Sequence, residues 1–219
     1  MKKSILAAAF VAASCAGAAS ANTVNVTKQG SSAFGTPNWS SAVNVTGPTR
    51  TISARAGAFR LTGDAGFGDF VAFCVDLAHN LSNGLPGPYT INNALFTNPV
   101  VANIDKLFTT GYSSISDAST AAGFQLALWE IVEDSDNGFD LTSGDFKVNS
   151  ASGDVLAAAN DFLGGVHGGS AMGGYQVTFL DSESGQDLVT VSAVPVPAAG
   201  LLLLTGLGGI AALRRRKKA

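Results

Sequence analysis

The chain contains little charge, little sulfur and little histidine. Of its 219 residues only 13% are charged, and two cysteines, two histidines and two methionines stand against 46% hydrophobic residues and 26 glycines. This composition excludes a disordered chain, a coiled coil and a multi-span membrane protein. It suits one compact β-rich extracellular domain with short additional segments better than a cytosolic enzyme.

Basic side chains are scarce in the body of the chain. All 16 acidic residues lie between the ends, whereas seven of the 13 lysines and arginines lie in the two terminal segments. The six that remain leave the body with 6 minus 16, a net charge of −10. We therefore expect no nucleic-acid partner and no electrostatic attachment to anionic lipid.

Common catalytic patterns are missing as well. The sequence has no serine-hydrolase elbow, no P-loop and no dinucleotide-binding fingerprint. His79 and His167 lie far apart without a second thiol, which argues against zinc. If one strand carried Cys74, Asp76 and His79, the first two would share a face and His79 would lie on the other. We expect neither a conventional enzyme nor a bound cofactor.

The N-terminal segment, residues 1–21, has the three parts of a secretory signal peptide. Lys2 and Lys3 are followed by an apolar run over 5–13 and by the small residues Ala-Ser-Ala ending at Ala21. Signal peptidase would cleave after Ala21, which removes Cys15. Lipid modification of Cys15 is the alternative, although a small alanine stands where lipoprotein signals have a larger aliphatic residue.

The C-terminal segment, residues 194–219, combines three features in a fixed order. A short motif is followed by an apolar stretch over 199–213 and by a basic cluster. The motif is Val194, Pro195, Val196, Pro197 and Ala198, and the cluster is Arg214, Arg215, Arg216, Lys217 and Lys218. Fifteen helical residues cover roughly 22 Å, a short membrane span whose basic end would stay in the cytoplasm.

This tail resembles the VPLPA-type relatives of the PEP-CTERM sorting signals, with Val196 in place of the commoner leucine. The resemblance implies a Gram-negative bacterium whose exosortase-type enzyme recognises the tail at the inner membrane and cleaves it. The body would then pass to the cell surface or the exopolysaccharide matrix. A permanent short membrane anchor is the alternative.

The body, residues 22–193, begins and ends with strand-like patterns. Apolar residues alternate in several short segments bounded by glycine and proline. These segments contain Val24 and Val26, Val43 and Val45, Ile52 to Ala56, Phe59 and Leu61, Tyr175 to Phe179, and Leu188 to Val191. A nearly continuous apolar run over 70–77 predicts a buried central strand.

Helical patterns occupy the middle of the body. They cover 101–108, 120–132 and 152–163, and Asp117 or Ser119 is suited to cap the second helix. The order of strands, helices and strands predicts an α+β fold, in which two or three helices are inserted into a β-rich sandwich or barrel-like sheet.

Two residues of the predicted core are unusual. Without the signal peptide, Cys74 has no second cysteine with which to form a disulfide, and a small buried core residue is its simplest role. Gln125 lies on a helix that is apolar almost all round, so its side chain should point into the core. A buried amide without partners costs about 1–3 kcal/mol, and two hydrogen bonds to a strand backbone would remove this cost.

The segments around these residues resemble the two signatures of bacterial thioester adhesin domains. The first is the aromatic-Cys-aliphatic triplet 73–75, and the second is the apolar-Gln pattern over 124–128, which Trp129 follows. The resemblance implies that Cys74 and Gln125 form an internal thioester, a hidden electrophile that a nucleophile on another surface captures. Phe73, Phe124 and Trp129 would shield it from water.

Carboxylates also surround a glycine turn after the central helix. Asp134, Asp136 and Asp140 are spaced somewhat as in calcium loops, although the glycine comes one position earlier than in an EF-hand. Calcium is one interpretation of this segment, and an acidic solvated turn is the other.

Taken together, the sequence predicts an exported adhesion or biofilm-scaffold protein. Covalent attachment through Cys74 and Gln125 is its stronger form. The alternative is a non-covalent matrix or glycan-binding module in which both residues belong to the core. The expected partners are signal peptidase, an exosortase-type enzyme, the membrane before processing, and a surface polysaccharide or other matrix component.

Overall fold

The computed structural model describes residues 23–64, 66–134, 138–169 and 173–194. The predicted signal peptide lies outside these residues, as does the predicted sorting signal apart from Val194. Within the described ranges, no helix is long and apolar enough to cross a membrane.

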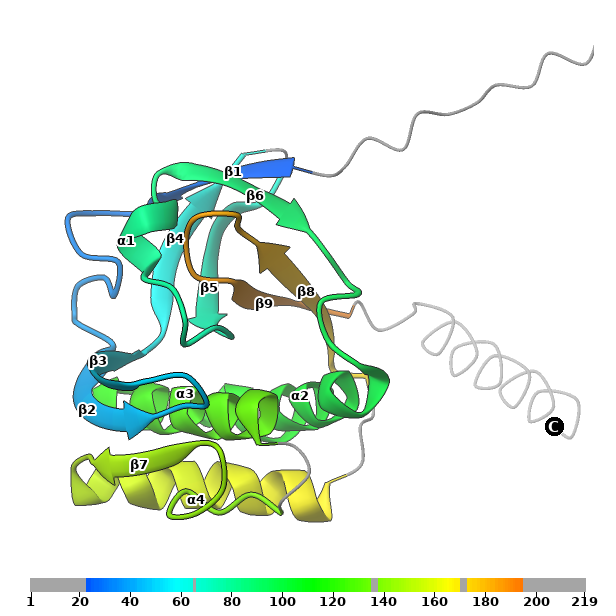
Figure 1. The fold of residues 1–219 in the computed structure, drawn as a ribbon. Helices are drawn as coiled ribbons and strands as arrows, with labels where there is room; N and C mark the ends of the chain where they lie inside the picture. Colours follow the sequence, from blue (N-terminus) through cyan, green and yellow to red (C-terminus); the bar gives the residue numbers. More distant parts are fainter. Residues whose placement is uncertain (1–22, 65, 135–137, 170–172, 195–219) are drawn as a thin grey trace, which may run out of the picture.

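Six antiparallel strands close into a barrel (Figure 1). In barrel order they are β1 (Thr23–Lys28), β4 (Phe59–Gly63), β5 (Gly68–Cys74), β9 (Leu188–Ala193), β8 (Tyr175–Asp181) and β6 (Gly87–Ile91). The period-two pattern explains β1, because Val24 and Val26 are buried while their neighbours face solvent. Closure pairs both edges of the sheet and leaves no free edge strand.

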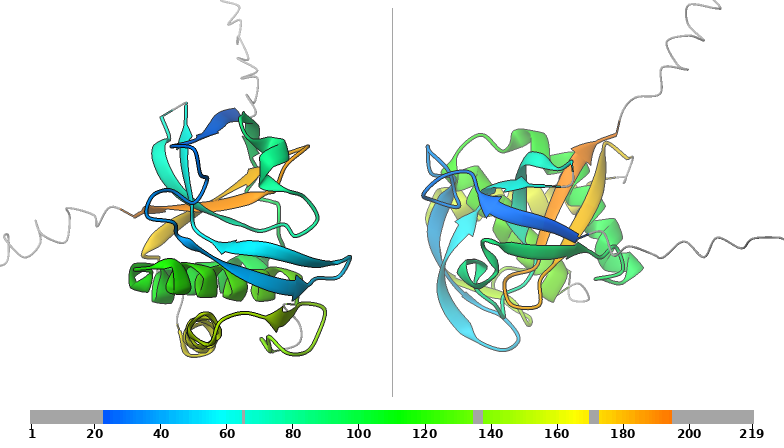
Figure 2. Two further views of the ribbon diagram at one scale, coloured as in Figure 1. Left: turned by 90° about the vertical axis from the view of Figure 1, so that its left-hand side faces the viewer. Right: turned by 90° about the horizontal axis from the view of Figure 1, so that it is seen from above.

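A second, three-stranded sheet has the order β3–β2–β7. It comprises β2 (Ser40–Thr46), β3 (Thr51–Gly57) and β7 (Lys147–Ser150). The β2–β3 hairpin lies against the central helix in the views of Figures 1 and 2. Its buried residues, among them Val45 and Ala56, extend the core beyond the barrel.

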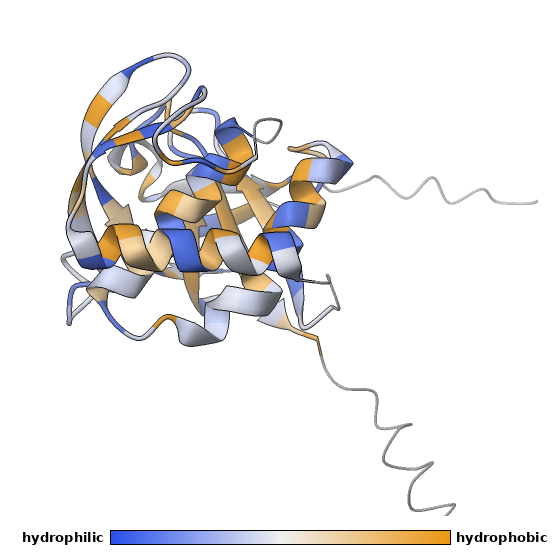
Figure 3. Cartoon of the chain, turned by 90° about the horizontal axis from the view of Figure 1, so that it is seen from below, coloured by the Kyte–Doolittle hydropathy of each residue, from blue (hydrophilic) through white to orange (hydrophobic). Residues whose placement is uncertain are grey.

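Three long helices lie below the barrel in Figure 1. They are α2 (Asn98–Gly111), α3 (Ala118–Glu133) and α4 (Gly153–Gly168), and shorter turns occur at α1 (Leu81–Gly84) and in the 3₁₀-helix Tyr112–Ser114. Helix α3 is the middle layer between the barrel and α4, which explains why it is apolar almost all round. The outer helical surface, seen in Figure 3, alternates between hydrophilic and hydrophobic segments.

Local sequence explains where α3 begins and how closely it packs. Asp117 accepts a hydrogen bond from the backbone N–H of Thr120 at 2.7 Å and forms a capping box with that residue. Gly123 faces α4, where an added Cβ would come within 2.6 Å of the Ala158 Cβ. The lack of a side chain at this position therefore sets the distance between the two helices.

The prediction of a β-rich α+β fold with a barrel-like sheet is confirmed, and three helices of more than one turn are present in the described ranges. The strands β6 and β7 were not predicted, because short segments with weak alternation do not stand out from loops. The predicted strand over 70–77 is wrong at its C-terminal end. The strand stops at Cys74, where pairing with β9 ends.

Candidate functional site

Cys74 and Gln125 lie together where the barrel contacts α3. The backbone N–H of Cys74 donates to Gln125 Oε1 at 2.9 Å, and Gln125 Nε2 donates to the carbonyl oxygen of Cys74 at 2.7 Å. Both residues are only 1% exposed. The side-chain amide therefore lies edge-on against the backbone of the residue that carries the thiol, 51 positions away in the sequence.

The sheet register explains why this position is open to a side chain. Strand β4 begins at Phe59, which pairs with Ala72, so β4 contributes no partner for Cys74. On its other side β5 pairs with β9 as far as Leu188, which is opposite Cys74. The Gln125 amide takes the place of the missing β4 residue and satisfies the exposed end of the ladder.

The thiol itself faces the loop that follows β5. Cys74 Sγ donates to the carbonyl oxygen of Asp76 at 2.8 Å and lies 3.3 Å from the Asp76 backbone nitrogen. Burial raises the pKa of Cys74 to about 12, and the carboxylates of Asp76 and Asp187 act in the same direction. The group is therefore a neutral thiol near neutral pH.

Trp129, one helical turn after Gln125, places a donor beside this thiol. Its indole N–H lies near enough to lower the pKa of Cys74, yet it has no hydrogen-bond partner of normal geometry in the described residues. The side chain is 2% exposed. A buried donor left without an acceptor costs about 1–3 kcal/mol, so any acceptor that forms at the sulfur would be stabilised here.

Aromatic side chains enclose the other side of the site. The ring centroids of Phe73 and Phe124 are 4.7 Å apart, and Phe108 packs within 6.1 Å of Phe73. The side chains of Phe73, Phe124 and Trp129 are each at most 2% exposed. The three predicted shielding residues thus lie in the core on β5 and α3, while their shielding of a thioester stays a prediction.

A hollow of about 370 Å³ reaches the cysteine from outside. Cys74 and Trp129 line it together with residues of the β2–β3 hairpin, the loop before it and the segment around α1. These include Phe34, Ile52, Arg55, Asn80 and Leu81, and Phe59 of β4 also lines the hollow. Although Cys74 is almost inaccessible to bulk water, a small nucleophilic group has a route toward its side chain.

The chain is similar to two solved domains of bacterial surface proteins. One is the N-terminal thioester domain of a surface protein from Clostridium perfringens, with 12% identity, a TM-score of 0.43, and coverage of 62% of this chain and 89% of that one. The other is the N-terminal domain of the Streptococcus pyogenes pilus tip adhesin Cpa, with 15% identity, a TM-score of 0.42, and coverage of 63% and 85%. No protein-family model and no curated protein matches the chain. Such distant likenesses do not by themselves indicate what this chain does.

The predicted separation of Asp76 and His79 is wrong. Because β5 ends at Cys74, the chain turns, and His79 Nδ1 lies 2.6 Å from a carboxylate oxygen of Asp76. The Cys74 thiol bonds to the Asp76 main chain and not to this pair. No Cys–His contact of the kind that activates a thiol protease forms among the described residues.

The acidic residues after α3 are already engaged. Asp134 accepts a hydrogen bond from the Asp145 backbone N–H at 2.9 Å, and Asp140 accepts bonds from Thr142 and Ser143. Asp136 lies outside the described residues. In the part of the chain that the structure describes, no group of three acidic, histidine or cysteine side chains is arranged to hold a metal ion. The calcium interpretation stays a prediction.

One buried charge on α3 was not singled out from the sequence. Glu130 is fully buried, and neither carboxylate oxygen has a hydrogen-bond partner of normal geometry in the described residues, although the Asp140 backbone N–H lies near enough to lower its pKa. Burial, followed by the nearby Asp134 carboxylate, raises its pKa to about 7. The signal was present in the sequence, because Gln125 and Glu130 are the two polar residues in the otherwise apolar segment 121–132 of this helix.

Proposed function

We propose that the protein is an exported cell-surface or matrix protein that attaches to a partner covalently, through an internal thioester between Cys74 and Gln125. The observation that supports this proposal is the position of the Gln125 amide on the Cys74 backbone, in a site that also holds an orphan indole donor and opens to a hollow. Adhesion or matrix scaffolding is the resulting role, and no turnover of a substrate is implied.

In the formation of the thioester, the Cys74 sulfur replaces the amide nitrogen on the Gln125 carbonyl carbon. Cys74 Sγ bonds to Gln125 Cδ, the Cδ–Nε2 bond breaks, and the thiol proton leaves with that nitrogen as ammonia. Two hydrogen bonds disappear in this step, because the sulfur no longer donates to Asp76 and Nε2 no longer donates to Cys74. The bond from the Cys74 N–H to Oε1 can persist throughout.

That persistent bond is aimed at the atom where charge develops. As sulfur attacks, Gln125 Oε1 gains negative charge, and the Cys74 backbone N–H at 2.9 Å donates to it. The surrounding apolar core strengthens this interaction because little water competes for the oxygen. One donor of this kind accounts for part of the required stabilisation.

In the capture of a partner, the partner's nucleophile replaces the Cys74 sulfur on the same carbon, Gln125 Cδ. An amine or hydroxyl enters through the hollow beside Cys74 and attacks Cδ, the C–S bond breaks, and the nucleophile's proton returns to sulfur. A thiolate with a conjugate acid as weak as the Cys74 thiol is a poor leaving group. Donation from the Trp129 N–H would offset this disadvantage by stabilising the departing sulfur.

The terminal segments belong to the same proposal. The order of basic start, apolar run and small residues over 1–21 supports export, with signal peptidase removing the segment. The motif over 194–198, the apolar stretch and the basic cluster support recognition by an exosortase-type enzyme at the inner membrane of a Gram-negative bacterium. The body, residues 22–193, would then reach the cell surface or matrix.

A non-covalent module remains the second candidate, and one observation favours it. The two hydrogen bonds between the Gln125 amide and the Cys74 backbone are enough to explain the burial of this amide without further chemistry. In that case Cys74 is a small apolar core residue.

Intact mass distinguishes these candidates. The full chain, purified without reducing agents or amines, should weigh about 17 Da less than calculated for its processed ends, because ammonia is lost when the thioester forms. Methylamine should then bind covalently, and peptide mapping should place it on Gln125. A full calculated mass in every preparation would contradict the thioester.

Matched variants identify the bond. Cys74→Ala and Gln125→Glu should each abolish the mass deficit, because the first removes the nucleophile and the second the ammonia-releasing amide. Gln176→Glu, an exposed position on β8, should leave the deficit intact. Loss of the deficit in this control would indicate that the ammonia had come from Gln176, which would contradict a bond between Cys74 and Gln125.

The sorting proposal has its own test. Protein recovered from the host's surface and from its membrane should differ in mass by the tail, with Arg214 to Lys218 present only in the membrane fraction. Finding Arg216 in the surface material would contradict cleavage.

A further inference from the structure

Arg60, on β4, differs from the neighbouring arginines because its guanidinium group has no hydrogen-bond acceptor or ion-pair partner among the described residues. Arg50 donates to the Leu77 carbonyl oxygen, and Arg55 donates to the side chain and backbone of Ser40. The guanidinium of Arg60 instead lies over the ring of Trp39, 4.4 Å from its centroid, with no carboxylate or carbonyl acceptor among the described residues. Its N–H groups are therefore available to a ligand.

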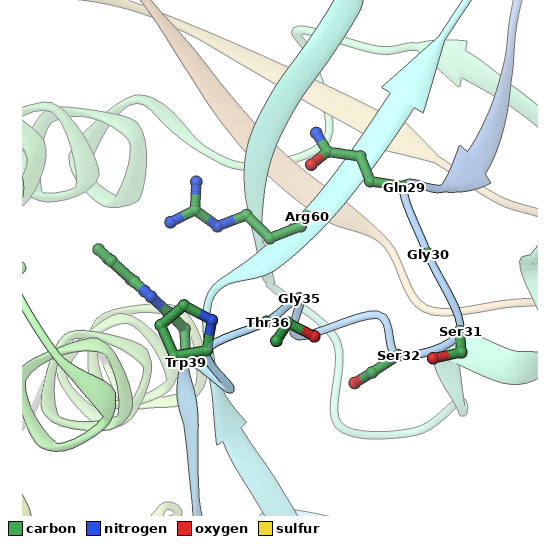
Figure 4. Close-up of a pocket in the computed structure, with 9 residues that line it drawn as sticks. Gln29, Gly30, Ser31, Ser32, Gly35, Thr36, Trp39 and Arg60 are labelled. Carbon is green, nitrogen blue, oxygen red and sulfur yellow. The ribbon is translucent and has the colours of Figure 1, made fainter.

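Two hollows meet at this pair, and Trp39 and Arg60 line both of them. One, of about 420 Å³, is walled by the polar loop between β1 and β2 (Figure 4). The other, of about 300 Å³, is walled by aromatic side chains. We call the combined surface the Arg60–Trp39 groove, defined by Gln29, Ser31, Ser32, Thr36, Trp39, Arg60, Tyr112 and Tyr175.

The charge of this groove is opposite to that of the body. The body has a net charge of −10, yet no aspartate or glutamate lines either hollow, and Arg60 is the one charged residue in both linings. An anionic group in the groove therefore meets an unpaired cation without a neighbouring carboxylate in the wall. A cationic ligand would find no counter-charge there.

The loop between β1 and β2 is bonded to the Arg60 backbone and packs against the stem of its side chain. The Gln29 N–H donates to the Arg60 carbonyl oxygen at 3.2 Å, and the Arg60 N–H donates to the carbonyl oxygen of Ala33 at 2.6 Å. Gly35 has a φ of +74°, and an added Cβ would lie 2.7 Å from the Arg60 Cγ. The loop can lie against the arginine stem because this residue is glycine.

We infer that the Arg60–Trp39 groove binds a carboxylated polysaccharide, with one uronate carboxylate on the Arg60 guanidinium. A guanidinium group receives a carboxylate through two parallel hydrogen bonds, which fixes orientation as well as charge. The hydroxyls of Ser31 and Thr36 present hydrogen-bonding groups that sugar hydroxyls match, and so does the amide oxygen of Gln29, whose Nε2 donates to the Leu61 carbonyl oxygen. Tyr112 and Tyr175, whose ring centroids are 5.2 Å apart, provide rigid amphipathic surfaces for a sugar ring.

The groove adjoins the opening to Cys74. Phe34 lines the hollow at Cys74, whereas Gly35 and Thr36, the next two residues of the same loop, line the groove. A polysaccharide in the groove would thus be held one loop away from the proposed thioester. The binding site itself does not depend on that bond.

The test uses the full chain carrying Cys74→Ala, so that covalent capture cannot contribute. Polygalacturonate is titrated in a calorimeter and compared with fully methyl-esterified polygalacturonate, which has the same sugars without the charge. We expect binding of the acidic polymer and at least a tenfold weaker response to the ester. Equal binding of the two polymers, or no binding of either, would overturn the proposal.

Charge-matched variants locate the site. Arg60→Gln should weaken binding about tenfold or more, because it removes a bidentate charged contact. Lys106→Gln, which removes one positive charge from α2, should retain the affinity of the parent. An equal loss in both variants would indicate unspecific charge attraction and contradict the groove. Melting temperatures by circular dichroism should show that Arg60→Gln remains folded, since its guanidinium makes no hydrogen bond in the described structure.

Tryptophan fluorescence gives an independent readout. The chain has two tryptophans, and Trp39 lies in the groove whereas Trp129 lies in the core. Saturable quenching by polygalacturonate should persist in Trp129→Phe and disappear in Trp39→Phe. The opposite pattern would place the polymer at the hollow beside Cys74 and Trp129 and would refute the assignment.

Discussion

Helix α3 buries two polar side chains, which differ in their hydrogen bonding. Gln125 is satisfied by two backbone hydrogen bonds at the end of β5, whereas the carboxylate oxygens of Glu130 have no hydrogen-bond partner of normal geometry in the described residues. Both side chains are at most 1% exposed. The comparison shows that burial alone does not reveal the role of a polar residue, because the partner determines its cost.

The two positions also differ in what neighbours them. Gln125 is hydrogen-bonded to the backbone of Cys74, and it is Cys74, together with Trp129, that lines a hollow. Glu130 lies near the carboxylate of Asp134, which raises its pKa further after burial has done so. Gln125 therefore has the surroundings of a reactive site, while Glu130 is a source of pH-dependent stability.

The largest expected effect concerns Gln125, the buried polar residue whose side chain is hydrogen-bonded. Gln125→Leu should lower the free energy of unfolding by about 2–5 kcal/mol, because it leaves the buried N–H and C=O of Cys74 without partners. Chemical denaturation measures the change. Gln176→Leu, at an exposed position of β8, is the control and should change stability by less than about 0.5 kcal/mol. A loss of similar size in both variants would mean that the two hydrogen bonds do not distinguish Gln125.

The second prediction concerns Glu130 and the pH dependence of stability that its raised pKa implies. The pKa of Glu130 is raised in the folded state to about 7 from an ordinary value of 4.5, so folding favours the neutral form. The associated stability is fully present below about pH 4.5 and is lost as pH rises through about 7. Relative to Glu130→Gln, the native chain should lose about 1–3 kcal/mol between these values.

Denaturant unfolding of the native chain and Glu130→Gln at a series of pH values checks this. Other titrating groups affect both proteins alike and cancel in the difference. Parallel pH profiles would mean that Glu130 finds a partner or is solvated, and the contrast with Gln125 would fail.

The third prediction tests whether Trp129 acts on the sulfur through its indole N–H or only through packing. If a thioester forms, Trp129→Phe should slow its reaction with methylamine about tenfold, corresponding to about 1.4 kcal/mol of lost stabilisation of the departing sulfur. The mass deficit itself should remain. Phe146→Leu, which alters the aromatic neighbour of Trp129 at 6.3 Å, is the packing control and should leave the rate nearly unchanged. A similar slowing in both variants would assign the effect to packing.

The smallest expected effect concerns the N-terminus of α3, which positions Gln125 on its second turn. Asp117→Ala removes the capping box and should cost about 1 kcal/mol in unfolding free energy. Asp154→Ala, in the first turn of α4 where Ser152 is the cap, should cost less. The yield of the mass deficit should be unchanged, because packing against the barrel and α4 holds the rest of α3. A loss of the deficit would show that the cap controls the geometry of the site.

Much of the fold could be predicted because its elements follow local rules. Alternating valines predict β1 and β2, the apolar run predicts the buried β5, and Asp117 marks the start of α3. The strands β6 and β7 could not be predicted, because β6 contains a proline and a glycine and β7 is four residues long. Their partners, β1 and β2, come from distant parts of the chain.

The candidate site could be predicted only as a pair of residues. A lone cysteine and a polar residue on an apolar helix are visible in the sequence, and so is Glu130 by the same reasoning. The end of β5 at Cys74 was not visible, because it depends on where β4 and β9 begin. The error about Asp76 and His79 has this same cause.

By itself, the sequence determined the period of most strands and helices, the cap of α3 and the negative charge of residues 22–193, since these depend on residue types and short spacings. Only the tertiary structure decided that the Gln125 amide completes the β5 ladder. It also decided that Glu130 has no hydrogen-bond partner of normal geometry, and the Arg60 guanidinium no acceptor, among the described residues. The physical reason is that a polar group's cost and chemistry depend on its partners in space, and closure of the barrel brings those partners from remote segments of the chain.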